Sequence, residues 1–222
     1  LEQRGVKSGM TVMTILPPRL DWYLILALNS LGATSCSGGS QVPETLKFDL
    51  VVCTKLTPDY PTGKQILIDQ MFLGAVGKAS SREITPETDP SHIVRLVLTS
   101  GTTGTSKAVP LTLASLEERK RMNEQAGDGG TAMSLMGIGS LAGGNRVLYA
   151  AWDGKPFATP ANRGDWSSWL SLVQTVRPSR LGGSPAQLDT FFATAWNKRA
   201  RLDFLSQVTS AGAVFPAVLA ER

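Results

Sequence analysis

The chain has 222 residues, 42% hydrophobic and 18% charged, which is the balance of a soluble globular protein with ample length to bury a core. The 22 lysines and arginines exceed the 18 aspartates and glutamates, so the formal net charge is +4. Two short basic clusters, residues 119–121 and 198–201, fall on predicted helices, where a solvated helix face is favoured over a nucleic-acid patch. We therefore expect no nucleic-acid partner.

The cysteines and the single histidine do not form a catalytic or metal-binding pattern. Cys36 and Cys53 are too few and too isolated for a disulfide framework or a zinc site, and buried thiols in a reducing, cytoplasmic compartment account for them. His92 follows an Asp-Pro-Ser turn, where a loop or capping role is favoured over catalysis. The longest apolar stretch, residues 22–33, is interrupted by polar residues and is shorter than the roughly 20 residues of a membrane span. We expect no membrane insertion.

The first third of the chain has the pattern of a β-α-β unit. Residues 11–16 form a short apolar, β-branched run that ends at two prolines, which predicts a buried strand. An apolar helix is expected next, with Asp21 as its cap and Gly32 at its C-terminal end. Residues 33–37 then predict the second strand.

A second group of elements leads up to the middle of the chain. Residues 43–48 predict a short helix and residues 49–54 a core strand. Proline and glycine punctuate residues 55–90, so we expect connecting structure there, with one strand at residues 65–68. The apolar run at residues 93–99 predicts the strand that leads into the most distinctive segment of the sequence.

That segment, residues 98–107, reads L-T-S-G-T-T-G-T-S-K. Glycines let backbone N–H groups approach a ligand closely, hydroxyls donate further hydrogen bonds, and lysine adds a mobile positive charge. This composition predicts a loop that binds phosphate. The candidate ligand-binding residues are Thr99, Ser100, Gly101, Thr102, Thr103, Gly104 and Lys107.

The segment is not a Walker A motif, because its glycines are three residues apart and Ala108 follows the lysine. An ordinary P-loop ATPase or kinase is therefore disfavoured. A surface loop rich in serine, threonine and glycine that binds no ligand is the structural alternative.

The same residues resemble the phosphate-loop signature of the adenylate-forming superfamily, Thr-Ser-Gly-Thr-Thr-Gly-x-Pro-Lys-Gly, which is found in acyl-CoA synthetases, aryl-acid ligases and luciferases. Ser106 replaces the family's proline and Ala108 its last glycine; both changes affect loop stiffness and leave the phosphate-facing residues intact. The resemblance implies that Lys107 and residues 99–104 hold the β- and γ-phosphates of ATP, with Lys107 in a catalytic role.

The residues after the loop predict further alternation of strands and helices. A short strand is expected at residues 108–111, followed by a helix to about residue 125 that Thr112 or Ser115 caps. Residues 131–142 show no clear period. Members of the superfamily usually carry an aromatic residue and a histidine there, near the pocket for the acid; this sequence carries Ser-Leu-Met-Gly-Ile-Gly, so the acyl pocket is unassigned.

The last third of the sequence predicts two helices and three strands. Residues 146–152, R-V-L-Y-A-A-W, predict a strand, and Asp165 caps a helix with an aromatic, core-type face. Residues 180–184 predict a short strand, and Pro185 opens the next helix.

The last predicted strand and its turn lie in residues 207–213, which resemble the superfamily's Ser-Gly-Gly-Ala-Pro-Leu segment. This resemblance implies that Ser210, Ala211 and Gly212 lie against the adenine, where short side chains let a purine approach the backbone.

The resemblance covers essentially the whole chain and implies the α/β fold of an incomplete N-terminal domain, with mostly parallel sheets flanked by helices in αβαβα layers. It implies a first α/β subdomain portion in residues 1–92 and a second, carrying the phosphate loop, in residues 93–222. The segments expected beyond Arg222 include the glutamate that reaches magnesium, the ribose-binding aspartate and the C-terminal small domain.

The implied activity is ATP-dependent ligation of a carboxylic acid through an acyl-adenylate, with release of pyrophosphate and later acylation of CoA or a carrier-protein thiol. ATP, Mg²⁺ and CoA are the implied cofactors, and the 222 residues alone are expected to be inactive. Two alternatives stay open from the residues: a nucleotide-binding module without ligase activity, and a structural α/β domain whose loop binds nothing.

Overall fold

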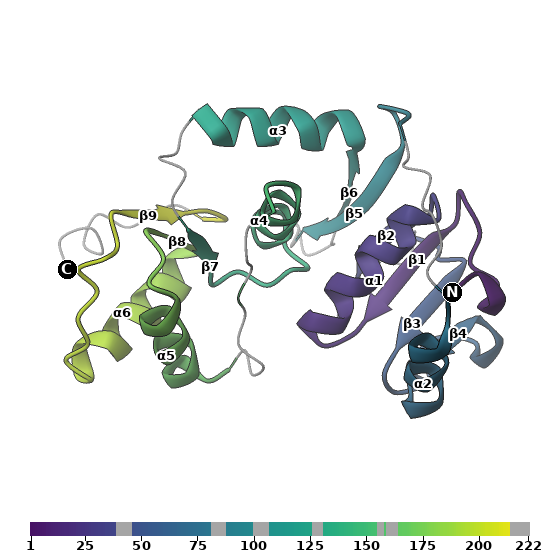
Figure 1. Ribbon diagram of the computed structural model, residues 1–222, viewed down its shortest axis with the longest axis horizontal. Helices are drawn as coiled ribbons and strands as arrows, with labels where there is room; N and C mark the ends of the chain where they lie inside the picture. Colours follow the sequence, from purple (N-terminus) through teal and green to yellow (C-terminus); the bar gives the residue numbers. More distant parts are fainter. Residues whose placement is uncertain are drawn as a thin grey trace. The chain divides into compact units, whose positions relative to one another are not determined.

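The computed structural model describes residues 1–38, 46–80, 88–99, 107–125, 131–154, 158 and 164–213. The chain divides into two compact units, residues 1–119 and 120–222 (Figure 1). The fold is α/β, with mostly parallel strands flanked by helices, as the sequence predicts. No helix among these described residues is long and apolar enough to cross a membrane.

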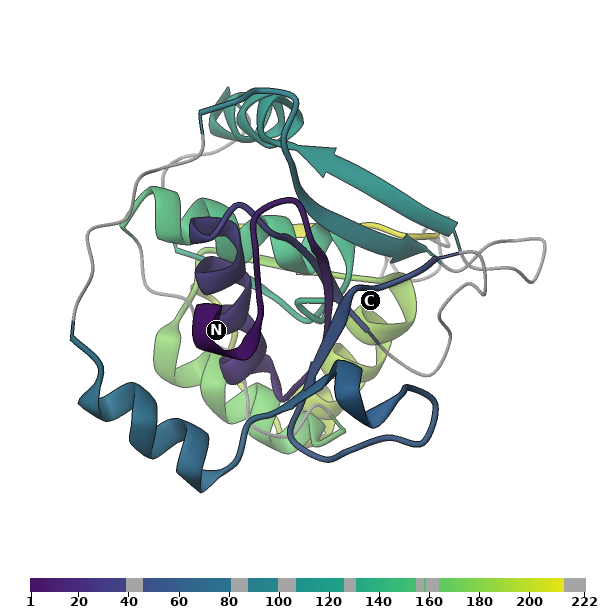
Figure 2. The same cartoon turned by 90° about the vertical axis from the view of Figure 1, so that its right-hand side faces the viewer.

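The first unit is built on a six-stranded sheet with the order β4-β3-β1-β2-β5-β6. β1 to β5 pair in parallel, and β6 is antiparallel to β5. The paired teal arrows of β5 and β6 lie side by side in Figure 2. The strands are β1 (Thr11–Ile15), β2 (Thr34–Ser37), β3 (Leu50–Cys53), β4 (Gln65–Leu67), β5 (Ile93–Thr99) and β6 (Lys107–Thr112).

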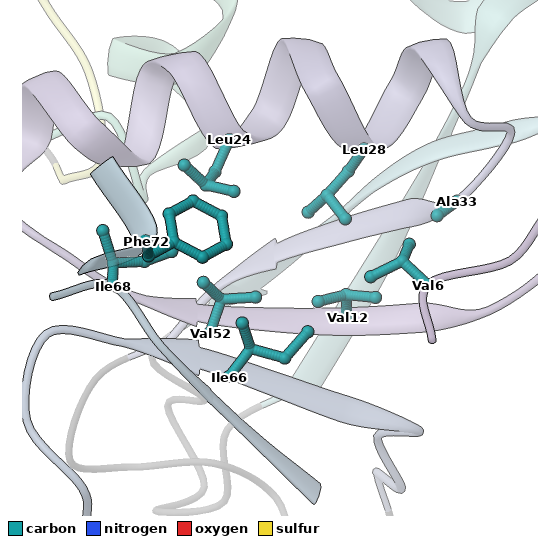
Figure 3. Packing of buried hydrophobic residues seen from close by; sticks show 9 residues of the cluster. All are labelled: Val6, Val12, Leu24, Leu28, Ala33, Val52, Ile66, Ile68 and Phe72. Carbon is teal, nitrogen blue, oxygen red and sulfur yellow. The ribbon is translucent and has the colours of Figure 1, made fainter. Parts of the chain in front are cut away.

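Helices α1 (Pro18–Ser30) and α2 (Gln70–Lys78) supply apolar side chains to one hydrophobic cluster over this sheet. Leu24 and Leu28 of α1 point toward the strand residues Val12 and Val52, and Phe72 of α2 completes the layer (Figure 3). Successive strand residues point to opposite faces, so Met13 belongs to a different buried cluster from its neighbour Val12. Short 3₁₀ turns lie at Glu2–Arg4 and Thr62–Lys64.

The second unit has a three-stranded parallel sheet with the order β7-β8-β9. Its strands are β7 (Ala132–Ser134), β8 (Arg180–Gly183) and β9 (Gln207–Ser210), and its helices are α4 (Leu141–Trp152), α5 (Trp166–Val176) and α6 (Pro185–Asn197). A buried cluster around Trp169, Leu181 and Phe191 joins α5 and α6 to the sheet. Helix α3 (Leu113–Gln125) includes residues 119 and 120, between which the sequence divides into the two units.

Most predicted elements are present where local signals are strong. The predicted strand at residues 93–99 is β5, and Gly32 follows α1 with a φ of +67°, the left-handed conformation that a helix stop favours. Asp165 caps α5 by accepting a hydrogen bond from the Ser167 N–H. Thr112 is the residue that caps α3, since its hydroxyl accepts from the Ser115 N–H at 3.2 Å.

The predicted strand at residues 146–152 is wrong, because these residues form the last two turns of α4. The helix begins at the Ser140 cap, whose hydroxyl accepts from the Gly143 N–H at 3.0 Å. Val147 and Tyr149 favour strands locally, but both are buried on the helix, and tertiary packing overrides such weak preferences.

Three other predictions need correction. The expected connecting structure at residues 55–90 contains helix α2, which Asp69 caps by accepting from the Phe72 N–H at 2.8 Å. Asp21 does not cap α1, which starts at Pro18; it lies buried in the first turn. Of the predicted helix at 43–48, residues 46–48 have no regular structure and the rest lie outside the described residues.

The first compact unit, residues 1–119, includes β5 and β6. β5 and β6 extend the sheet of the first unit, because β5 pairs with β2. The strand that leads into the candidate phosphate loop therefore belongs to the first sheet.

Candidate functional site

The two ends of the candidate phosphate loop are held together at one edge of the first sheet. Thr99 is the last residue of β5, Lys107 is the first residue of β6, and the two are paired in the antiparallel register. The Thr99 hydroxyl donates to the Lys107 carbonyl oxygen at 3.3 Å, and the Lys107 side chain is exposed. Ser100, Gly101, Thr102, Thr103 and Gly104 lie outside the described residues.

The end of β5 lies where α/β proteins commonly bind their ligands. β1 to β5 run parallel, so their carboxyl ends share one edge of the sheet, and β5 delivers Thr99 to that edge. Ligands of open α/β sheets bind outside the carboxyl ends of the strands. The sequence-predicted ligand residues Thr99 and Lys107 are therefore brought together where a ligand is expected.

Two side chains of β2 fix the start of β5 against the sheet. The Thr34 hydroxyl donates to the Ile93 carbonyl oxygen at 2.6 Å, and the Ser35 hydroxyl donates to the Val94 carbonyl oxygen at 3.1 Å. These bonds supplement a short parallel ladder, in which Ser35 pairs with Arg95. Serine and threonine on β2 thus help to set the position of the strand that carries Thr99.

Buried polar and charged side chains connect several elements of this sheet. Arg95 of β5 is 1% exposed, and its Nη2 donates to the Ser37 hydroxyl at 2.8 Å. Burial lowers the pKa of the Arg95 guanidinium, while the charge of Asp21 and the nearby Cys36 raise it. The Thr14 hydroxyl donates to the Asp21 carboxylate at 2.5 Å. The network links β1, β2, β5 and α1.

The sequence pattern does not point to Arg95 as a residue near the site. Its signal was a single arginine within the apolar run I-V-R-L-V-L, where a buried charge requires partners from other strands. Which partners those are follows only from the strand order β1-β2-β5.

The predicted adenine-facing residues form one turn in the second unit. Ser210 ends β9, and the Ala211 N–H donates to the Gly183 carbonyl oxygen of β8 at 3.1 Å. Gly212 has a φ of +94°, a conformation that residues with a side chain rarely adopt. Ser210, Ala211 and Gly212 are all exposed, so this short-side-chain surface is accessible at the carboxyl end of β9.

No group of three or more histidine, cysteine, aspartate or glutamate side chains among the described residues could hold a metal ion. The magnesium ligands that the resemblance implies are expected beyond residue 222, so this finding does not test them. Burial raises the pKa of the Cys36 thiol to about 11 and raises the pKa of Cys53 as well, which favours the protonated, less nucleophilic form of both thiols.

Comparison with solved structures shows the same fold in the following three proteins. O-succinylbenzoate-CoA synthetase from Bacillus subtilis, in complex with AMP, is 15% identical with a TM-score of 0.79. The N-terminal domain of FACL13 from Mycobacterium tuberculosis, with an inhibitor bound, is 17% identical with a TM-score of 0.83. A long-chain-fatty-acid-CoA ligase from Archaeoglobus fulgidus is 16% identical with a TM-score of 0.81.

Each comparison covers 99% of this chain but only 59%, 61% and 49% of the respective structures, so the chain spans about half to three-fifths of their length. Comparison with curated proteins gives no match. The sequence pattern of the AMP-binding enzyme family matches residues 40–222, which is most of the chain and includes both candidate ligand-binding segments. The chain belongs to the AMP-binding enzyme family.

Proposed function

We propose that the full-length protein uses ATP to activate a carboxylic acid as an acyl-adenylate, releases pyrophosphate, and then acylates CoA or a carrier-protein thiol. The observation that carries this proposal is the pairing of Thr99 with Lys107 at the carboxyl edge of a parallel sheet, at the two ends of a Ser-Gly-Thr-Thr-Gly-Thr-Ser segment. Family membership supports the nucleotide part of the proposal.

Lys107 and residues 99–104 would hold the β- and γ-phosphates. ATP supplies the electrophilic α-phosphorus and pyrophosphate as the leaving group. The exposed ammonium of Lys107 stabilises the negative charge that grows on the pyrophosphate oxygens as the bond to the α-phosphorus breaks. The Thr99 hydroxyl, now bonded to the Lys107 carbonyl, keeps the two ends of the loop in register.

Residues 210–212 would form one wall of the adenine site. Their short side chains leave backbone accessible to a flat purine, and the bond from Ala211 to β8 fixes the turn. Mg²⁺ would bind through ligands that the superfamily carries after the segment described here, so we assign none of its ligands to this chain.

The proposed partners are a carboxylic acid and a thiol acceptor. Two structures with this fold are named as CoA synthetases or ligases of carboxylic acids, O-succinylbenzoate and a long-chain fatty acid, which supports the same class for this protein. The chain spans only part of such enzymes, and we propose that the 222 residues alone do not catalyse the reaction. The cytoplasmic location stays a prediction.

The test is ATP–pyrophosphate exchange by the full-length protein, with Lys107→Ala compared with Lys64→Ala, which removes an exposed lysine at the end of a 3₁₀ turn. We expect Lys107→Ala to lower exchange by about 10²- to 10³-fold, the usual loss when a charge-stabilising group is removed, and Lys64→Ala to leave it unchanged. Unchanged exchange in Lys107→Ala refutes the catalytic role.

Two other outcomes identify the alternatives. ATP binding without exchange in the wild-type protein would indicate a nucleotide-binding module, and absence of binding at millimolar ATP would indicate a structural domain. These measurements need the complete protein, because a partial site is expected to bind ATP weakly.

A further inference from the structure

The candidate adenine-facing turn follows an edge strand with little support of its own. β9 has four residues, three of them exposed, and it pairs only with β8 in the sheet of the described residues. A short, exposed edge strand opens easily unless side chains hold it. The position of residues 210–212 therefore depends on the side-chain contacts that hold β9 in the sheet.

Arg146 of α4 makes such a contact. Its Nη2 donates to the Thr209 hydroxyl at 3.1 Å, and Thr209 directly precedes Ser210. Burial and the neighbouring charge of Arg180 lower the pKa of the Arg146 guanidinium, and Tyr149 raises it. A charged donor in such surroundings forms a stronger hydrogen bond than a neutral one.

Gly182 provides the space for this contact. It pairs with Thr209 in the β8–β9 register, so side chains at the two positions would lie on the same face of the sheet. A Cβ on Gly182 would lie 3.1 Å from Thr209 Oγ1, 3.3 Å from Arg146 Nε and 3.4 Å from Arg146 Nη2. The guanidinium therefore occupies the place that a side chain on the central strand would take.

We infer that Arg146 is a positioning residue, which fixes residues 210–212 by holding Thr209 across the side-chain-free position Gly182. The consequence for the nucleotide rests on the proposed function: a fixed turn presents a preformed surface to the adenine, and a loosened turn weakens ATP binding without touching the phosphate loop. Arg146 need not contact the nucleotide.

The first test measures the turn without any ligand. Thr209→Val replaces the hydroxyl by a methyl group and keeps a strand-forming residue, while Thr209→Ser keeps the hydroxyl and is its matched control. Amide hydrogen exchange at Ala211, whose N–H is bonded to Gly183, is expected to become about tenfold faster in Thr209→Val and to stay at the wild-type rate in Thr209→Ser. Equal exchange rates in the two variants overturn the inference.

Two further substitutions disturb the contact between Arg146 and Thr209 at other residues. Arg146→Met removes the donor, and Gly182→Ala places a methyl group against both partners. Both should accelerate Ala211 exchange at least as much as Thr209→Val. Arg201→Met is the control, because it removes a largely exposed arginine of the same unit. It should leave the rate of Ala211 exchange unchanged. A slow Ala211 amide in folded Arg146→Met protein contradicts the assignment.

The second test links the turn to ATP in the full-length protein. In ATP–pyrophosphate exchange, Thr209→Val is expected to raise the KM for ATP about tenfold and to change the KM for pyrophosphate less than twofold, because pyrophosphate does not meet the adenine wall. Thr209→Ser should restore the wild-type KM for ATP.

The two tests separate failure of the inference from failure of the proposed function. Faster Ala211 exchange together with an unchanged KM for ATP supports the positioning role of Arg146. The same result refutes the proposal that residues 210–212 contact the adenine. If the wild-type protein shows no ATP–pyrophosphate exchange, the proposed function fails, and the rate of Ala211 exchange still decides whether Arg146 fixes the turn.

Discussion

The buried network at Arg95 gives the sharpest test of what stabilises the sheet that leads into the candidate phosphate loop. Arg95→Met keeps an unbranched side chain that fills most of the space and removes the charge. The Asp21 carboxylate, 3% exposed, would then stay buried without the positive charge that now attracts it. Ser37 would also lose its 2.8 Å hydrogen bond.

The size of the effect follows from these surroundings. A buried charge that loses the opposite charge near it costs about 3–5 kcal/mol, because water does not reach it and nothing compensates it. Asp21→Asn in the Arg95→Met background removes that uncompensated charge, and its amide oxygen can still accept from Thr14. We expect the double variant to be more stable than Arg95→Met alone, with a coupling energy of about 1 kcal/mol or more.

The assay should report on the first unit alone, and the cysteines make this feasible. Both are buried, Cys36 on β2 and Cys53 on β3, within the unit that contains Arg95. Cys53 is the better reporter, because the Arg95 charge acts directly on the pKa of Cys36. The rate of Cys53 alkylation under native conditions, measured by peptide mass spectrometry, reports the opening equilibrium of the unit.

A loss of 3–5 kcal/mol should accelerate Cys53 alkylation by about 10²- to 10³-fold or more, since 1.4 kcal/mol corresponds to a factor of ten. Arg19→Met is the control, because Arg19 is exposed and its guanidinium only lies over the Tyr23 ring at 6.0 Å. An acceleration below about tenfold in Arg95→Met, or strictly additive effects in the double variant, would show that attraction between Arg95 and Asp21 does not stabilise the sheet.

Two further predictions concern local packing and pH. Gly143→Ala should destabilise the second unit by about 1–3 kcal/mol or more, because a Cβ there would lie 2.3 Å from the Gly137 carbonyl oxygen. The measurement is the thermal unfolding midpoint, which should fall. Gly74→Ala is the control: a Cβ on Gly74 of α2 meets no neighbouring atom, so this variant should be slightly more stable than the wild type. Burial raises the pKa of the Cys36 thiol to about 11 in the folded protein, against 9.0 for an ordinary thiol. As the pH rises, the unfolded chain therefore loses this proton before the folded chain does. The free energy of unfolding should fall between pH 9 and pH 11. In urea unfolding, Cys36→Ala should show a shallower loss over that range, and an identical pH dependence would contradict the burial of this thiol.

Short-range patterns account for much of what could be predicted. The apolar run of β5 and the Asp165 and Pro185 signals at the starts of α5 and α6 depend on contacts within a few residues, which the sequence displays directly. The α/β class and the place of the candidate phosphate loop after β5 follow from the same signals. The conformation of residues 100–106 lies outside what the structure describes, so its match to the family pattern rests on the sequence.

The candidate nucleotide-binding residues come from the sequence and its family resemblance: a glycine- and hydroxyl-rich segment ending in Lys107, and the small residues 210–212. Three features appear only in the folded protein: the helical conformation of residues 146–152, the place of β5 in the first sheet, and the hydrogen bonds from Arg95 to Ser37 and from Arg146 to Thr209. The physical reason is distance along the chain. The Arg146 partner is 63 residues away and the Arg95 partner 58, so these contacts exist only after the strands have paired.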